Sequence, residues 1–116
     1  METQFRLVLD KSLAHQLAEI PTLNSEIVPI EDVPGKQLRL GMAEATAIVT
    51  FLAATAGLTK TIAEIAESIL EWMKKHKQQH IKILIEGPRN DDVVEVDEKW
   101  DSDQLAEKIH FTVREN

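Results

Sequence analysis

The sequence predicts a single α+β domain, residues 1–116, in which a small, mostly antiparallel sheet is covered by helices. Three observations favour this class. Apolar residues alternate along short segments towards both ends of the chain, apolar residues recur at helical spacing in its centre, and Gly87-Pro88 separates two of the alternating segments. With 43% hydrophobic and 28% charged side chains, the composition suits one folded domain, and no linker or repeat divides it.

The chain opens with a strand and a short helix. The strand is predicted at residues 4–9, because its large apolar side chains occupy alternate positions and therefore share one face of a sheet. These positions are Phe5, Leu7 and Leu9. The helix follows, with Ser12 available as its cap and apolar residues at helical spacing until Pro21 ends the pattern. Its core face comprises Leu13, Leu17 and Ile20.

An edge strand or a bulge is predicted at residues 26–31. The segment Glu-Ile-Val-Pro-Ile-Glu has the composition of a strand, but Pro29 lacks the N–H that an interior strand donates to its neighbour. A turn signal at residues 33–35, Val-Pro-Gly, then opens a polar stretch without periodicity.

The central segment, residues 42–78, predicts a long helix interrupted at Gly57. Its first half contains an uncharged run, residues 45–59, which we expect to be buried within the domain or between copies of it. Residues 61–77 are amphipathic, with charged side chains outside a single apolar face. That face comprises Ile62, Ile65, Ala66, Ile69, Trp72 and Met73.

A hairpin and a final helix complete the domain. Apolar residues alternate on both sides of the turn signal at residue 87, so we predict a hairpin over residues 80–97. The final helix is predicted over residues 101–114, with Asp101 as its N-cap and Gln104 completing a capping box. Its core face comprises Leu105, Ile109 and Val113, and Phe111 lies outside that face.

The charge of the chain argues against one class of partner. Twenty acidic residues against 13 basic ones give a net charge of −7, which opposes association with nucleic acids. Seven of the acids lie between Asp91 and Asp103, where Lys99 is the single base. The first residues contain no apolar run of signal-peptide length, which favours a cytoplasmic protein.

No standard catalytic or cofactor motif is present, so we predict no catalytic residue, no cofactor and no metal. The absence of cysteine removes thiolate chemistry. His76 and His80 stand four residues apart, a spacing that allows two imidazoles on one helix to share a zinc ion, but His80 is expected to begin a strand. Glu64, Glu67 and Glu71 are expected on the solvated side of the central helix.

Several features follow one another in a characteristic order. A strand at residues 5–9 precedes the segment Glu-Ile-Pro-Thr-Leu, the Pro34-Gly35 turn, an apolar stretch of small residues through Ala56-Gly57, and the segment Ile-Leu-Glu-Trp-Met-Lys-Lys at 69–75. The hairpin follows directly. This order resembles the effector-associated constant component family of bacterial conflict systems. The resemblance implies a non-enzymatic part of an antiviral defence system that acts with a separate effector protein, such as a caspase-like or trypsin-like peptidase.

We predict an adaptor or regulatory component that binds its partner through the apolar helix and the acidic segment. The candidate residues are Ile48, Val49, Phe51, Leu52, Asp91, Asp92 and Asp97. The surplus apolar area of the helix also predicts a homo-oligomer. Two alternatives stay open: a membrane-active effector that inserts the helix at residues 45–59, and a small enzyme that uses carboxylates or histidines. The uncharged helix would measure about 22 Å, short of the roughly 30 Å hydrocarbon core of a bilayer.

Overall fold

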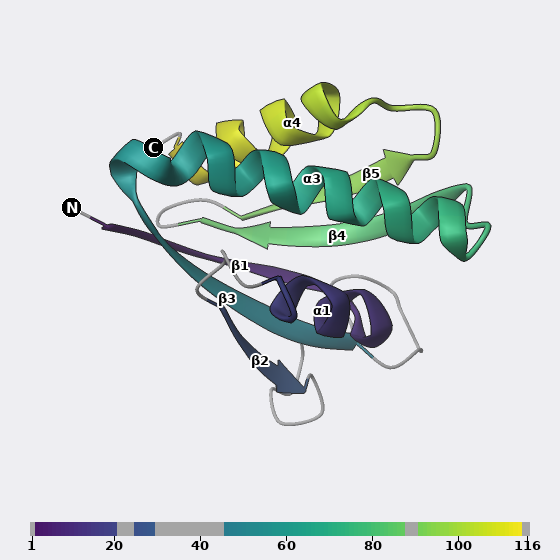
Figure 1. Cartoon of the computed structure of the whole chain (residues 1–116), viewed down its shortest axis with the longest axis horizontal. Helices are drawn as coiled ribbons and strands as arrows, with labels where there is room; N and C mark the ends of the chain where they lie inside the picture. The colour runs from purple at the N-terminus through teal and green to yellow at the C-terminus, as the bar shows by residue number, and fades with distance from the viewer. Residues whose placement is uncertain (1, 21–24, 30–45, 88–90, 115–116) are drawn as a thin grey trace.

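Five strands form one antiparallel sheet in the order β2-β3-β1-β4-β5. The computed structural model describes residues 2–20, 25–29, 46–87 and 91–114. The strands are β1 (Glu2–Asp10), β2 (Ser25–Pro29), β3 (Thr46–Ala54), β4 (His80–Glu86) and β5 (Asp91–Asp97). In the described part of the chain the helices are α1 (Lys11–Ala18), α3 (Leu58–Lys75) and α4 (Ser102–Arg114), and the 3₁₀ turn η2 (Thr55–Gly57) precedes α3. The predicted α+β class is confirmed (Figure 1).

The described elements from β1 to β4 follow the order β-α-β-β-α-β. The strands β1 and β2, connected through α1, are parallel with β3 between them, and β3 and β4, connected through α3, are parallel with β1 between them. This is the ferredoxin-like split βαβ arrangement, to which β5 and α4 are added beyond β4. Because this fold serves many unrelated functions, its topology does not identify an activity.

The two faces of the sheet carry different apolar sets. One face packs against α1, α3 and α4 and forms the main core with them (Figure 1). In this core the rings of Phe5 and Phe51, opposite each other in β1 and β3, stack with their centroids 5.2 Å apart. On the other face Val8 stands in register with Ile48 and Leu84, and all three are buried. The central strands are therefore buried on both faces.

The helix predicted over residues 42–78 is wrong in its first half, because residues 46–54 form β3. Residues 42–45 lie outside the described part of the chain. The strand lies between β1 and β2, so Val49 is buried on one face and Ile48 on the other. A strand buried on both faces is a continuous apolar run without alternation, and such a run resembles a buried helix. The β-branched residues that favour a strand here are Thr46, Ile48, Val49 and Thr50.

The second half of the predicted helix is confirmed as α3, but α3 ends at Lys75 and not at residue 78. The end is a Schellman motif, in which the backbone N–H of Gln78 donates to the carbonyl of Met73 at 2.8 Å and that of Lys77 to the carbonyl of Lys74 at 3.3 Å. Lys77 has a φ of 54°, the left-handed conformation that this motif requires. The turn directs the chain into β4.

The other predicted elements are confirmed with small changes. The cap of α1 is Asp10 and not Ser12, because the Asp10 carboxylate accepts a hydrogen bond from the Ser12 backbone N–H at 2.8 Å. The Ser12 hydroxyl instead accepts one from the Trp72 indole at 3.3 Å. The strand β2 lies at a sheet edge, where Pro29 is tolerated. The remainder of the predicted edge strand and the turn at 33–35 lie outside the described residues.

Candidate interaction surface

The apolar residues predicted to bind a partner do not form a surface. Val49 and Phe51 lie in the core under the helices, and Phe51 is 1% exposed. Ile48 is buried on the other face of the sheet, and Leu52, four residues further along β3, is 37% exposed on that face. The correction of the helix to a strand therefore places three of these four side chains inside the folded chain.

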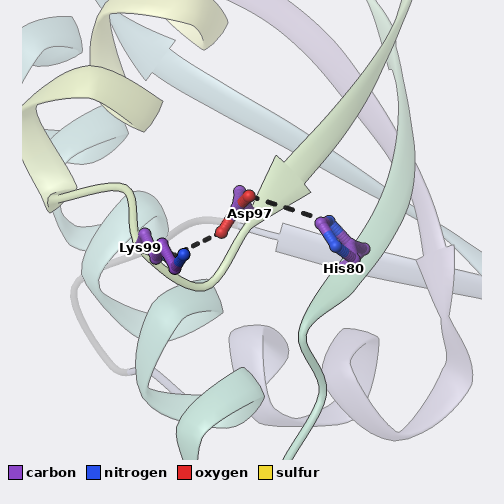
Figure 2. A network of polar contacts seen from close by, with 3 residues as sticks. All are labelled: His80, Asp97 and Lys99. Atoms are coloured by element: carbon purple, nitrogen blue, oxygen red, sulfur yellow. Dashed lines mark hydrogen bonds and ion pairs between the residues drawn. The ribbon is translucent and has the colours of Figure 1, made fainter.

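The predicted acidic residues lie in different environments. Asp97 closes the turn after β5: its Oδ1 accepts a hydrogen bond from the backbone N–H of Lys99 at 2.8 Å, and its Oδ2 lies 3.9 Å from His80 Nδ1 on the neighbouring strand (Figure 2). Asp91 and Asp92 are both exposed. Because consecutive strand residues point to opposite faces, Asp92 lies on the helix side of the sheet and Asp91 on the other side. Of the three predicted acids, Asp92 is the one beside α4.

The helix α4 is held by its cap and by one buried stripe. The backbone N–H of Gln104 donates to the Asp101 carboxylate at 2.8 Å, and the Asp101 N–H donates to the Gln104 side chain at 3.2 Å, which confirms the predicted capping box. The predicted core face is also confirmed, since Leu105, Ile109 and Val113 are buried. Phe111 lies outside this stripe and is 66% exposed.

Phe111 separates two grooves on the helix-bearing side of the molecule. The first, of about 480 Å³, lies between the start of α3 and the outer side of α4. Its lining comprises Thr59, Ile62, Ala63, Asp103, Ala106, Glu107, His110 and Phe111. The second, of about 430 Å³, lies between α4 and the start of β5. Its lining comprises Asp92, Gln104, Glu107, Lys108 and Phe111. An exposed aromatic ring thus stands among three acids and one lysine.

A third groove, of about 620 Å³, lies between the second half of α3 and the connection from β5 to α4. Its lining comprises Glu67, Leu70, Glu71, Lys74, Glu98, Lys99, Trp100, Asp101 and Ser102. The expected solvation of Glu67 and Glu71 is confirmed, since both are exposed at this groove. Local sequence patterns do not predict these grooves, because each groove forms between elements that are separated in the sequence. The available signal was Phe111, an aromatic residue outside the core stripe of its helix.

The histidine pair of the sequence does not share a face. The ring of His76, at the end of α3, stacks on Trp72 with centroids 4.5 Å apart, and its Nδ1 lies 3.0 Å from the Trp72 carbonyl oxygen. His80 begins β4, as predicted, and faces Asp97. Within the described residues, no cluster of three or more histidine, aspartate or glutamate side chains has a metal-binding arrangement. The helices found in this part of the chain are too short or too polar to cross a membrane.

One carboxylate is buried away from the grooves. Glu86, at the end of β4, is 5% exposed, and its Oε1 lies 3.4 Å from the Nε of Arg6 on β1. The two residues are cross-strand partners on the face of the sheet opposite the helices. The pair places a basic side chain beside a carboxylate that is buried in the sheet.

No family model and no curated protein matches the chain. One solved structure to which the chain is similar is a phage SAM lyase in complex with S-methyl-5′-thioadenosine, with 13% sequence identity and a TM-score of 0.37 over 86% of this chain and 92% of the lyase chain. A likeness of this degree carries no argument about activity or ligand.

Proposed function

We propose that this protein is a non-enzymatic adaptor or regulatory component that binds a partner protein through the surface around Phe111. Following the family resemblance, the partner is the effector of a cytoplasmic bacterial defence system, such as a caspase-like or trypsin-like peptidase. The observation that carries the proposal is the 66% exposure of an aromatic ring between two grooves. Leu105, Ile109 and Val113 pack α4 against the core, and Phe111 takes no part in that packing. Aromatic side chains are frequent anchors of protein interfaces.

The charges around Phe111 favour a particular kind of partner. Asp92, Asp103 and Glu107 line the two grooves, and Lys108 is the one lysine among the lining residues. A basic partner surface complements this arrangement, which raises the rate of association and selects against acidic competitors. The homo-oligomer remains a prediction. It was predicted from the apolar area of a helix, and those residues form a buried strand instead.

The two alternative functions receive no support from the described residues. Membrane insertion was predicted from a helix at residues 45–59, and residues 46–54 of that run form a central strand of the sheet. The enzyme alternative requires the glutamates of α3 to converge with His76 and His80. Glu67 and Glu71 are exposed at an open groove, and the two histidines belong to different elements with different neighbours.

The test is co-purification of the full chain with a caspase-like or trypsin-like peptidase of the same cell, the effector that the proposal names. We expect Phe111→Ser to lower the affinity for that effector at least tenfold, because the aromatic anchor is lost. The matched control is Val93→Ser, since Val93 is also exposed, at 43%, and lies on the opposite face of the sheet. Unchanged effector binding by Phe111→Ser, or no binding by the wild-type chain, contradicts the proposal. Equal melting temperatures of the variants show that folding is not the cause of a loss.

A further inference from the structure

We infer that the surface between α3 and α4 receives a basic amphipathic helix of the partner, about four turns long. This inference rests on the proposed function, because it names the segment that the partner inserts. It is carried by three properties of the surface: the alignment of two grooves, the small side chains in the first of them and the excess of acids around both.

The first and third grooves follow one another along α3 and α4. On α3 their lining residues recur at intervals of three or four and therefore lie along one face of the helix. These residues are Thr59, Ala63, Glu67, Leu70 and Lys74. The start of α3 lies beside the end of α4 and the second half of α3 beside the start of α4, so the helices are antiparallel (Figure 1). We call the line between α3 and α4 along these two grooves the seam. From Thr59 to Lys74 it measures about 22 Å, the length of a helix of about 15 residues.

The side chains of the seam suit a helix more than an extended strand. Ala63 and Ala106 are half-buried and small, so they let a third backbone approach the two helices closely. Larger apolar residues stand near the two ends of the seam, Phe111 at one and the half-buried Leu70 and Trp100 towards the other. A helix that lies in such a groove presents anchors at i, i+3 or i+4, and i+7. Strand addition would instead use an edge of the sheet.

The charge of the seam selects the occupant. Six acids line the two grooves, against two lysines. The acids are Glu67, Glu71, Glu98, Asp101, Asp103 and Glu107. A second copy of this chain would bring like charges together, which disfavours self-association through this surface. A helix with an apolar stripe flanked by lysine or arginine complements both the apolar side chains of the seam and the acids that surround them.

The first experiment uses a defined probe: an amidated 16-residue peptide of leucine and lysine with an apolar stripe at helical spacing. We expect titration into the isotope-labelled full chain to shift the amide signals of Ala63, Ala106 and His110, and to raise the helicity of the peptide. A peptide of the same composition in scrambled order is expected to bind at least tenfold more weakly, and one with glutamate in place of lysine not to bind. Equal binding of the scrambled peptide, shifts centred on Val93, or no binding at millimolar peptide contradicts the inference.

The second experiment separates this inference from the proposed function. Ala63→Gln and Ala106→Gln keep the charge and lower the helical propensity only slightly, but they fill the seam. Each is therefore expected to lower the affinity for both the peptide and the effector at least tenfold, with the melting temperature as the check on folding. Val93→Gln is the matched control on the other face. If Phe111→Ser disrupts effector binding and the glutamine variants do not, the proposed function stands and the helix in the seam is wrong. If none of them changes effector binding, both are wrong.

Discussion

Two phenylalanines mark the contrast between β3 and the outer side of α4. Phe51 stands in an uncharged run and is 1% exposed, stacked on Phe5 beneath the helices. Phe111 stands among charged residues and is 66% exposed between two grooves. The apolar segment that looks most available for a partner in the sequence is thus the centre of the sheet. The isolated aromatic ring on a charged helix is the one that solvent reaches.

The contrast reflects where a chain of this size places its apolar residues. A sheet whose central strands are buried on both faces needs apolar residues at consecutive positions, and Ile48 and Val49 supply them. An aromatic ring outside every core stripe has no such role in folding. We therefore expect stability and the proposed partner binding to depend on different residues, and the following predictions separate them.

The largest effect is expected for Phe51→Ala. Removing a ring that is fully packed in the core lowers the free energy of unfolding by about 3–5 kcal/mol, because apolar contacts are lost and a cavity remains. Urea denaturation followed by circular dichroism measures the change. A loss below about 1 kcal/mol, or a change of oligomeric mass without a change of stability, would show that Phe51 is not a core residue.

Much of the fold follows from local sequence patterns. The main incorrect prediction, a helix where residues 46–54 form β3, has a specific physical cause. Alternation identifies β1 and the β4-β5 hairpin, and the amphipathic period identifies α3, because polar or charged residues interrupt the apolar series in each of them. The strand β3 has no polar face, so Ala47 to Phe51 carries no period that separates a buried strand from a buried helix. Its position between β1 and β2 is a long-range property of the sheet.

The candidate surface was less predictable than the fold. Of the three acids predicted to bind a partner, Asp92 lines one of the grooves, whereas Asp97 is engaged in a turn and Asp91 lies on the other side of the sheet. The seam requires Ala63 and Ala106 to lie on neighbouring helices, and 43 positions separate them in the sequence. Only the packing of α4 beside α3 brings them together. Phe111 could be recognised as exposed, because it falls outside the i, i+4, i+8 stripe of its helix.

A smaller effect is expected for Asp101→Ala, which tests whether α4 holds the surface in place. The variant removes the acceptor for the Gln104 N–H and should lower the free energy of unfolding by about 1 kcal/mol. Hydrogen exchange should accelerate most in the first turn of α4. The matched control is Asp103→Ala, an exposed acid in the same turn that is not the N-cap. An equal loss in both variants would indicate that charge at the helix start, and not the cap, is responsible.

The smallest effect on stability is expected for Phe111→Ala, and it is the sharpest test of the comparison. Two thirds of this side chain is already in contact with solvent, so its truncation exposes little further apolar area, and we expect a change within about 0.5 kcal/mol. The same variant should bind the effector and the amphipathic peptide at least tenfold more weakly. Denaturation and binding are to be measured on one preparation. A destabilisation approaching that of Phe51→Ala would place Phe111 in the core, and the loss of binding could then be attributed to unfolding. A stable variant with lost binding separates the surface from the fold, because a ring that contributes nothing to the folded chain then contributes to the complex.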